Sequence, residues 1–202
     1  MAIRYYDKAI LDKIKYWVKD PNMRILGPDE TTRLFQLEFD QNNDKPISLP
    51  LIAISRNNDI EITSTAKKAL TYDGAHIAAT TKKSQVLNAI PIQLSYQLDI
   101  YTKYFAEADE YARNFIFNLI NYPKVQIEIN YNNSKILHDS NIILEQTLSD
   151  NSSIPERLIN GQFTRMTLRF KIDDAYLFSV PFMDNWSIEY PVNINLENKG
   201  ES

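Results

Sequence analysis

The chain has 202 residues, of which 44% are hydrophobic and 24% are charged, and its formal net charge is -4. This is the composition of an ordinary globular protein, and its acidic balance gives no overall attraction to phosphate backbones or anionic lipid. The lack of cysteine excludes disulfides, thiolate metal sites and cysteine nucleophiles, and it is typical of a protein that matures in a reducing cytosol.

The sequence carries no signal for a membrane, for export or for a phosphate-binding loop. No run approaches the roughly 20 apolar residues that a membrane helix needs, and the N-terminus is amphipathic from the start, unlike a signal peptide. Phosphate-cradling loops need closely spaced glycines, whereas the glycines here are Gly27, Gly74, Gly161 and Gly200. We therefore expect no membrane partner and no cofactor.

The first 60 residues predict a helix followed by two strands. Tyr5–Lys19 predicts a helix that ends before Pro21, because its apolar residues recur at helical spacing and charged residues fill the remaining surface. Thr32–Phe39 has a β-rich composition and precedes a turn-like run, which favours a strand. Leu49–Ser55 is a short apolar run typical of a buried strand. The charged residues assigned to the helix surface are Asp7, Lys8, Asp12, Lys13 and Lys15.

The stretch 61–86 has no sustained periodicity. It is rich in Thr and Lys and contains the turn-like Tyr72-Asp73-Gly74. Long irregular segments inside compact domains are usually functional or disordered. We expect a protruding loop or hairpin, an arm that orders against a neighbour, and the competing interpretation is a surface loop without a role.

The most regular pattern lies between Ile90 and Tyr122. Apolar residues alternate with polar ones over Ile90–Ile100, which predicts a half-buried strand, and Pro91 predicts that its start lies at a sheet edge or precedes the paired region. The period then changes to 3.6, which predicts a long helix over about 105–121, packed on one face of the sheet and ended by Pro123. The apolar residues of this helix are Ala108, Tyr111, Ala112, Phe115, Ile116, Leu119 and Ile120.

The last third predicts strands joined by short connections. Alternation over Val125–Tyr131 and a turn at Asn132-Asn133-Ser134 predict a strand and a hairpin into residues 135–137. The polar stretch 149–161 predicts a loop. Gln162–Ile172 and 176–182 alternate again about Asp173-Asp174, which predicts a second β-hairpin.

These elements together predict an α+β fold with a mostly antiparallel sheet, an N-terminal helix and the helix at about 105–121. We expect residues 1–192 to form a single α+β domain with the possible extended arm at 61–86. Residues 193–202 are polar and are expected to form a C-terminal tail.

The residues that could carry catalysis are few and scattered. His76 and His138 are the two histidines, and neither has a second histidine or a carboxylate at metal-ligand spacing. Glu107, Asp109 and Glu110 form an acidic group, but the positive end of a helix dipole already accounts for carboxylates in a first turn. No serine lies in a GxSxG motif. We therefore assign no catalytic, cofactor-binding or metal residue and expect a protein that is not an enzyme.

One row of basic residues leaves three interpretations open. Arg165, Arg169 and Lys171 alternate along the predicted strand, with Tyr176 or Tyr131 as possible stacking partners for bases. Such a row could follow nucleic acid, could form a charged subunit interface, or could be an ordinary solvated strand face. The solvated face is the favoured interpretation.

Aromatic residues are abundant, with 12 Tyr, 9 Phe and 2 Trp. Several tyrosines fall on predicted polar faces or loops, and tyrosine is common in interfaces because it buries a large area and keeps a hydroxyl group. Repeated protein contacts would use them, and the competing interpretation is that they fill a thin core. These tyrosines are Tyr5, Tyr6, Tyr72, Tyr101 and Tyr104.

Residues Ile90–Pro123 resemble small structural proteins of tailed bacteriophages. In these, a strand of the form Tyr-Gln-(apolar)-Asp-(apolar)-(aromatic or Thr), here Tyr96–Tyr101, is followed by an acidic helix. The resemblance implies a ring-forming tail-completion or tail-terminator (sheath-stabilising) subunit, commonly a hexamer, in the tail or neck of a virion assembled in the host cytoplasm. The implied partners are other copies of the chain, the tail tube, the tail sheath and the head-tail connector.

Other functions remain open at this stage. Related-looking folds also serve as neck, connector or baseplate components. A cytosolic ligand-binding protein or enzyme, with a pocket built from residues distant in sequence, is the rival hypothesis. Direct binding to nucleic acid is not expected.

Overall fold

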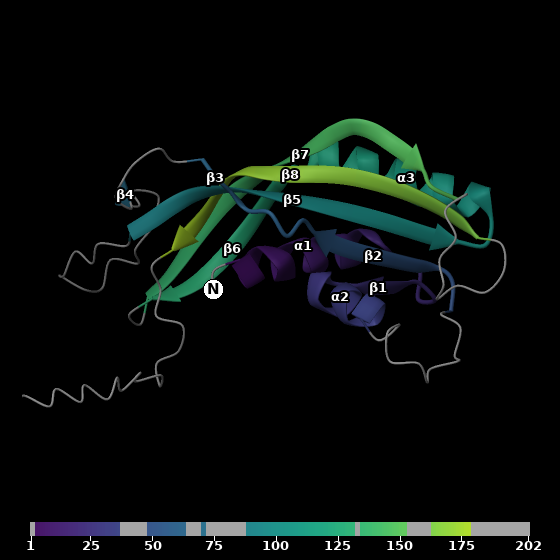
Figure 1. The fold of residues 1–202 in the computed structure, drawn as a ribbon, viewed down its shortest axis with the longest axis horizontal. Helices are drawn as coiled ribbons and strands as arrows, with labels where there is room; N and C mark the ends of the chain where they lie inside the picture. Colours follow the sequence, from purple (N-terminus) through teal and green to yellow (C-terminus); the bar gives the residue numbers. More distant parts are fainter. Residues whose placement is uncertain are drawn as a thin grey trace, which may run out of the picture.

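The computed structural model describes residues 3–36, 48–63, 70–71, 88–131, 134–152 and 163–178. Its strands form an eight-stranded sheet in the order β1-β2-β5-β8-β7-β6, with β3 and β4 also paired to β5 (Figure 1). The β1–β2 pair is parallel and the other described pairs are antiparallel, so the sheet is mixed and the predicted α+β class is confirmed. The elements in chain order are α1 (Ile3–Trp17), β1 (Arg24–Leu26), α2 (Pro28–Gln36), β2 (Leu51–Arg56), β3 (Glu61–Ile62), β4 (Leu70–Thr71), β5 (Asn88–Thr102), α3 (Phe105–Asn121), β6 (Lys124–Tyr131), β7 (Ser134–Asp150) and β8 (Thr164–Phe178).

The N-terminal helix is confirmed, two residues earlier than predicted at each end. Its buried residues Ile3, Tyr6, Ile10 and Ile14 follow the 3.6-residue period and pack into the main core. The prediction that Asp7 lies on the exposed surface is wrong. Its residue is only 9% exposed, because it lies one position after Tyr6 on the core-facing stripe and is paired there.

The predicted strand at Thr32–Phe39 is wrong where the structure describes it, because α2 occupies Pro28–Gln36. The start of this helix is set by Gly27 and Pro28, since proline is favoured at the first helical position. Glu30 accepts a hydrogen bond from the Gly27 amide at 3.2 Å, as in a capping box. These local signals outweigh the β-rich composition that follows them.

The strand β5 and the helix α3 form the centre of the fold. Residues Ile92, Leu94, Tyr96, Leu98 and Ile100 of β5 are buried on one face. Helix α3 covers the predicted range 105–121 and lies against β5, β8 and β7 through its own buried stripe (Figure 1). Its 17 residues span about 25 Å, so it is a helix of moderate length and not a long one. The stripe consists of Ala108, Ala112, Phe115 and Leu119.

Of the two alternatives predicted for Pro91, a position before the paired region is wrong, because β5 pairs with β8 past it. Pro91 is opposite Tyr176 of β8, and its carbonyl oxygen accepts a hydrogen bond from the Thr63 amide at 3.2 Å. In an antiparallel ladder the N–H and C=O of one residue point to the same side. The Pro91 nitrogen, which has no hydrogen to donate, therefore faces the end of the two-residue strand β3. The hydrogen bonds between β5 and β8 lie on the other side and do not need this donor.

The hairpin of β6 and β7 is confirmed, with Tyr131 opposite Ser134. Strand β7 extends well beyond the predicted residues 135–137 and changes partner along its length, pairing first with β6 and then, from Ile142, with β8. Between Leu144 and Leu148 its register shifts, with four positions on β7 against two on β8. The strand therefore arches away from the sheet at this bulge (Figure 1).

The second predicted hairpin is wrong, because β8 runs without a turn through Asp173 and Asp174. The step from Ile172 to Ala175 is opposite the shorter step from Leu94 to Ile92, so the acidic pair marks a β-bulge. Asn141 satisfies the Asp174 carboxylate through its backbone amide at 2.8 Å and its side-chain amide at 3.1 Å. The long partner β5 keeps β8 extended.

The strand predicted at Leu49–Ser55 is confirmed as β2. Two pieces of the predicted arm at 61–86 are the short strands β3 and β4, which pair with β5. The predicted loop at 149–161 begins inside β7, which ends at Asp150. Its residues 153–161, residues 64–69 and 72–86 of the arm and the tail at 193–202 lie outside the described residues.

Candidate functional site

An apolar cleft lies between α3 and the arch of β7. Its volume is 590 Å³, and Glu145 is its only charged lining residue among those the structure describes. The cleft is open because the bulge lifts β7 away from β8. Its α3 wall is apolar because the helix carries apolar residues, such as Ile120, outside its core-facing stripe. Its apolar lining residues are Ile116, Leu119, Ile120, Pro123, Ile142, Ile143, Leu144, Leu148 and Leu168.

Several of these side chains are strongly exposed. Ile120 is 62% exposed, and Ile143 and Leu148 are each 42% exposed. Phe117, on the outer side of α3, is also 62% exposed. Contiguous exposed apolar surface is typical of places where another molecule binds. This surface, the α3–β7 cleft, is therefore the first candidate site.

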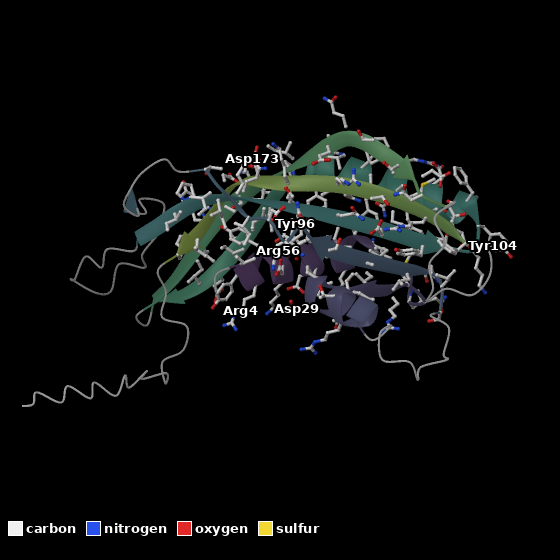
Figure 2. The ribbon with its side chains drawn as sticks, in the orientation of Figure 1. Arg4, Asp29, Arg56, Tyr96, Tyr104 and Asp173 are labelled. Atoms are coloured by element: carbon white, nitrogen blue, oxygen red, sulfur yellow. The ribbon has the colours of Figure 1, made fainter. Side chains whose placement is uncertain are left out.

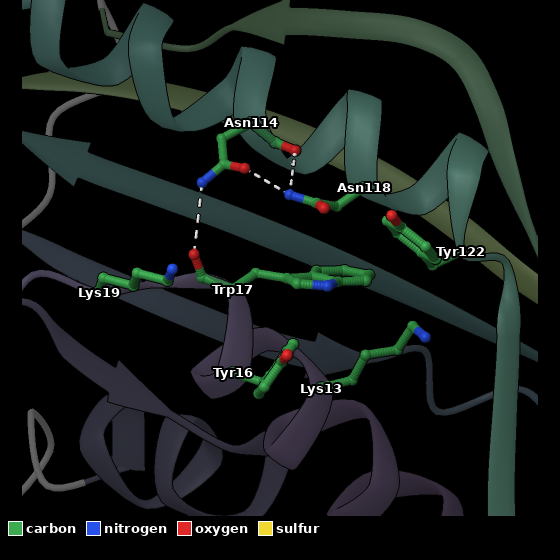
Figure 3. Close-up of a pocket in the computed structure, with 7 residues that line it drawn as sticks. All are labelled: Lys13, Tyr16, Trp17, Lys19, Asn114, Asn118 and Tyr122. Atoms are coloured by element: carbon green, nitrogen blue, oxygen red, sulfur yellow. Dashed lines mark hydrogen bonds between the residues drawn. The ribbon is translucent and has the colours of Figure 1, made fainter.

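A second hollow, the basic groove, lies between the end of α1 and the second half of α3 (Figure 3). It has a volume of 990 Å³ and is lined by Lys13, Tyr16, Trp17, Lys19, Asn114, Asn118 and Tyr122. The Asn114 side-chain amide donates to the Trp17 carbonyl oxygen at 3.4 Å and so joins the two helices. Asn118 in turn donates to the Asn114 carbonyl oxygen at 2.9 Å. The groove therefore has a defined wall of amides and aromatic rings.

Lys13 is held in place inside this groove. Its ammonium group donates to the Lys124 carbonyl oxygen at 2.7 Å and lies 4.9 Å from the centre of the Trp17 ring. Burial lowers the pKa of Lys13, because the charged form loses water. An approaching carboxylate would offset that loss.

The predicted basic row is largely engaged within the sheet. Arg165 is paired with Asp99 at 3.1 Å, and its guanidinium lies 5.3 Å from the centre of the Tyr101 ring. Arg169 donates to Gln97 at 3.4 Å, and Lys171 is 3.3 Å from Asp173. Two of these contacts cross from β8 to β5 and the third lies within β8, and together they account for the basic residues without a phosphate ligand.

Asp99 is the centre of the polar network on this face. It is 5% exposed and accepts hydrogen bonds from Thr167 at 2.6 Å and from Gln97 at 2.8 Å, in addition to its pair with Arg165. Asn151 donates to Thr167 at 2.8 Å from the end of the preceding strand. Thr167 is therefore buried under this network, at 1% exposure.

His138 lies in an aromatic cluster at the β7–β8 side of the core. Its ring is 5.2 Å from that of Tyr176 and 5.8 Å from that of Phe178, and its Nε2 is 2.9 Å from the Ser140 hydroxyl oxygen. Nε2 is also 3.1 Å from the Asp174 carbonyl oxygen. The other histidine, His76, lies outside the described residues.

His138 should make stability depend on pH. Burial lowers its pKa, so the unfolded chain takes up a proton before the folded one does. The contribution is fully present above the unfolded pKa of about 6.5 and is lost as the pH falls through the folded pKa, by at most about 1.4 kcal/mol per pH unit. We expect the free energy of unfolding, measured in urea, to fall more between pH 7.5 and 5 for the wild type than for His138→Gln. Equal pH dependence in the two proteins would contradict the prediction.

The acidic group of α3 is divided by the structure. Asp109 is paired with Arg113 at 2.7 Å, one helical turn later. Glu107 and Glu110 are exposed at the helix start. In the part of the chain that the structure describes, no group of three or more His, Asp or Glu side chains could hold a metal ion.

The tyrosines divide between the two interpretations left open by the sequence. Tyr6 and Tyr101 are buried, and the Tyr6 hydroxyl accepts a hydrogen bond from the Tyr176 amide at 2.9 Å. Tyr5 is partly buried against the core, and Tyr104 is 67% exposed. Tyr72 lies outside the described residues, as do most residues of the arm that contains it.

Sequence reasoning missed both candidate surfaces. The aromatic residues of the groove, Tyr16 and Tyr122, are 80% and 63% exposed. A signal was present for Tyr16, since it is a large ring on the polar face of α1, outside the apolar stripe. No sequence pattern indicated the bulge of β7.

No protein-family model matches the chain. A search of curated proteins found no match either. None of the described helices is long and apolar enough to cross a membrane.

Proposed function

We propose that this chain is a structural subunit that works by assembling with other protein chains. The observation that carries the proposal is the α3–β7 cleft, where Ile120, Ile143 and Leu148 are exposed along an apolar surface. Burying one such side chain stabilises a complex by about 1.5–3 kcal/mol. Several of them on one surface therefore favour a lasting contact.

Within that class, we propose a tail-completion or tail-terminator protein of a tailed bacteriophage. The support is the resemblance over Ile90–Pro123, a segment that coincides with β5 and α3. In this proposal α3 is the helix that such subunits pack on a mostly antiparallel sheet. The subunit forms a ring, commonly a hexamer, in the tail or neck, and it joins the tail tube or sheath to the head-side connector without catalysis.

The purified protein tests this proposal directly. We expect size-exclusion chromatography with light scattering to show a closed oligomer, alone or in the presence of tail tubes made from the tube protein of the same genome. Deleting the gene should produce tails of altered length or without heads attached. A monomer that ignores tubes, together with unchanged tails after deletion, would refute the proposal.

A variant of the α3–β7 cleft tests the observation that carries it. Ile120→Glu places a charge in the apolar cleft, which should weaken ring formation or tube binding at least about tenfold, since that corresponds to roughly 1.4 kcal/mol. The matched control is Asn121→Glu, which adds the same charge at an exposed neighbouring position outside the cleft lining. If Ile120→Glu assembles and binds tubes as the control does, the cleft is not an assembly surface.

A further inference from the structure

The basic groove has a single sign of charge and a ligand-sized volume. Its described lining holds two lysines and no carboxylate, and Tyr16 and Tyr122 expose aromatic surface at its rim. Figure 3 shows Lys13 and Lys19 on either side of the Trp17 ring. Positive charge beside exposed rings suits a partner segment that combines carboxylates with aromatic side chains.

The start of α3 has that complementary chemistry. Glu107 and Glu110 are exposed there, and beside them Tyr104 is 67% and Phe105 is 56% exposed. Figure 2 shows Tyr104 at one end of the molecule. The helix dipole accounts for Glu107 in the first turn, but its effect falls off beyond that turn and it explains neither Glu110 nor the exposed rings.

We propose that the acidic, aromatic start of α3 in one copy of the chain binds the basic groove of the next copy. The carboxylates of Glu107 and Glu110 face the ammonium groups of Lys13 and Lys19, and the exposed rings of both surfaces are buried between them. This inference rests on the proposed function, for which it names the contact between neighbouring subunits.

The positions of the two surfaces determine the kind of assembly. Glu107 and Asn118 lie eleven residues or about 16 Å apart along the axis of α3, and Glu110 lies one turn before the groove residue Asn114, so the acidic start and the groove are neighbouring but separate parts of the surface. A contact between two different surfaces is heterologous, and it repeats from copy to copy into a ring if the rotation closes. Each copy then contributes one groove and one acidic start.

Charge reversal in full-length protein tests the contact. Lys13→Glu with Lys19→Glu, and separately Glu107→Lys with Glu110→Lys, should each weaken self-association at least about tenfold in light scattering and analytical ultracentrifugation, because like charges then face each other. The four substitutions combined in one chain should restore assembly, as should a 1:1 mixture of the two double variants. Association of the wild type should also weaken from 0.15 to 1 M salt, where the screening length falls to about 3 Å.

The control and the outcomes separate this contact from the broader proposal. Lys8→Glu with Lys15→Glu reverses the same number of charges on exposed positions of α1 outside the groove lining, and it should leave assembly unchanged. The glutamate substitutions lie on exposed positions, so their variant stays informative if the groove variant fails to fold. Oligomers and tube binding that survive both reversals would overturn the contact and leave the proposed function standing. A wild-type monomer that ignores tubes would overturn both.

Discussion

Phe115→Ala is expected to lower the free energy of unfolding by about 3–5 kcal/mol, the usual cost of truncating a buried phenylalanine. Phe115 is 0% exposed and lies in the middle of the buried stripe of α3, in the core that the helix shares with β5 and β8. The loss combines the apolar surface returned to water with the cavity left beside the sheet. Urea unfolding followed by circular dichroism measures it.

Phe117→Ala is the matched control for this prediction. Phe117 lies two residues later, about 200° around the helix, and is 62% exposed. Its truncation should change the free energy of unfolding by no more than about 0.5 kcal/mol. Similar losses for the two variants would contradict the orientation of α3 on the sheet.

The same comparison shows why this part of the fold could be predicted from sequence. Both α3 and β5 bury one face, so their apolar residues recur with the period of the helix or of the strand. In α3 these residues are Ala108, Ala112, Phe115 and Leu119. The four stripe residues and the apolar residues of β5 from Ile92 to Ile100 are buried in the structure, and Ile90 is partly buried. Local periodicity is sufficient where one face is buried and the other is not.

The errors arose where local signals of different kinds compete. In α2, Gly27-Pro28 and the Glu30 capping contact start a helix, although the residues that follow have a strand-like composition. In β8, Asp173-Asp174 has the composition of a turn, but fifteen residues of β5 hold the strand extended and turn the signal into a bulge. In α2 a local capping contact determines the structure, and in β8 the neighbouring strand does. The identity of a neighbouring strand cannot be read from one sequence.

The candidate surfaces were still less accessible to sequence reasoning. The basic groove depends on Asn114 meeting Trp17, residues 97 positions apart, and the α3–β7 cleft depends on a bulge that no residue pattern marks. The abundance of tyrosine left two interpretations open, contacts with other proteins and filling of the core. It could not separate Tyr6, which fills the core, from Tyr16, which is 80% exposed.

Asp7→Ala is expected to cost about 3 kcal/mol of stability, the lower end of the range for breaking a buried ion pair. Asp7 is paired with Arg56 of β2 and accepts a hydrogen bond from the Tyr96 hydroxyl at 2.9 Å, and Figure 2 shows Arg56 and Tyr96 close together. Burial of the Tyr96 hydroxyl is the larger cause, and the negative charge of Asp7 the smaller one, of a Tyr96 pKa well above its ordinary value. The hydroxyl therefore stays protonated and donates to Asp7 throughout neutral pH. We expect the lower end of the range of energies because the Arg56 side chain is 27% exposed, so water partly screens the pair.

The cost of Asp7→Ala should come mainly from the charge left behind, and a second variant separates this from a loss of packing. Asp12→Ala, at an exposed position of the same helix, is the control and should change stability by no more than about 0.5 kcal/mol. Adding Arg56→Met to Asp7→Ala removes the stranded guanidinium, and apolar replacement of both partners of a buried pair is often neutral or stabilising. We therefore expect the double variant to unfold at a higher urea concentration than Asp7→Ala alone. If it unfolds at a lower concentration, Arg56 stabilises the contact of α1 with the sheet chiefly by packing and not through its pair with Asp7.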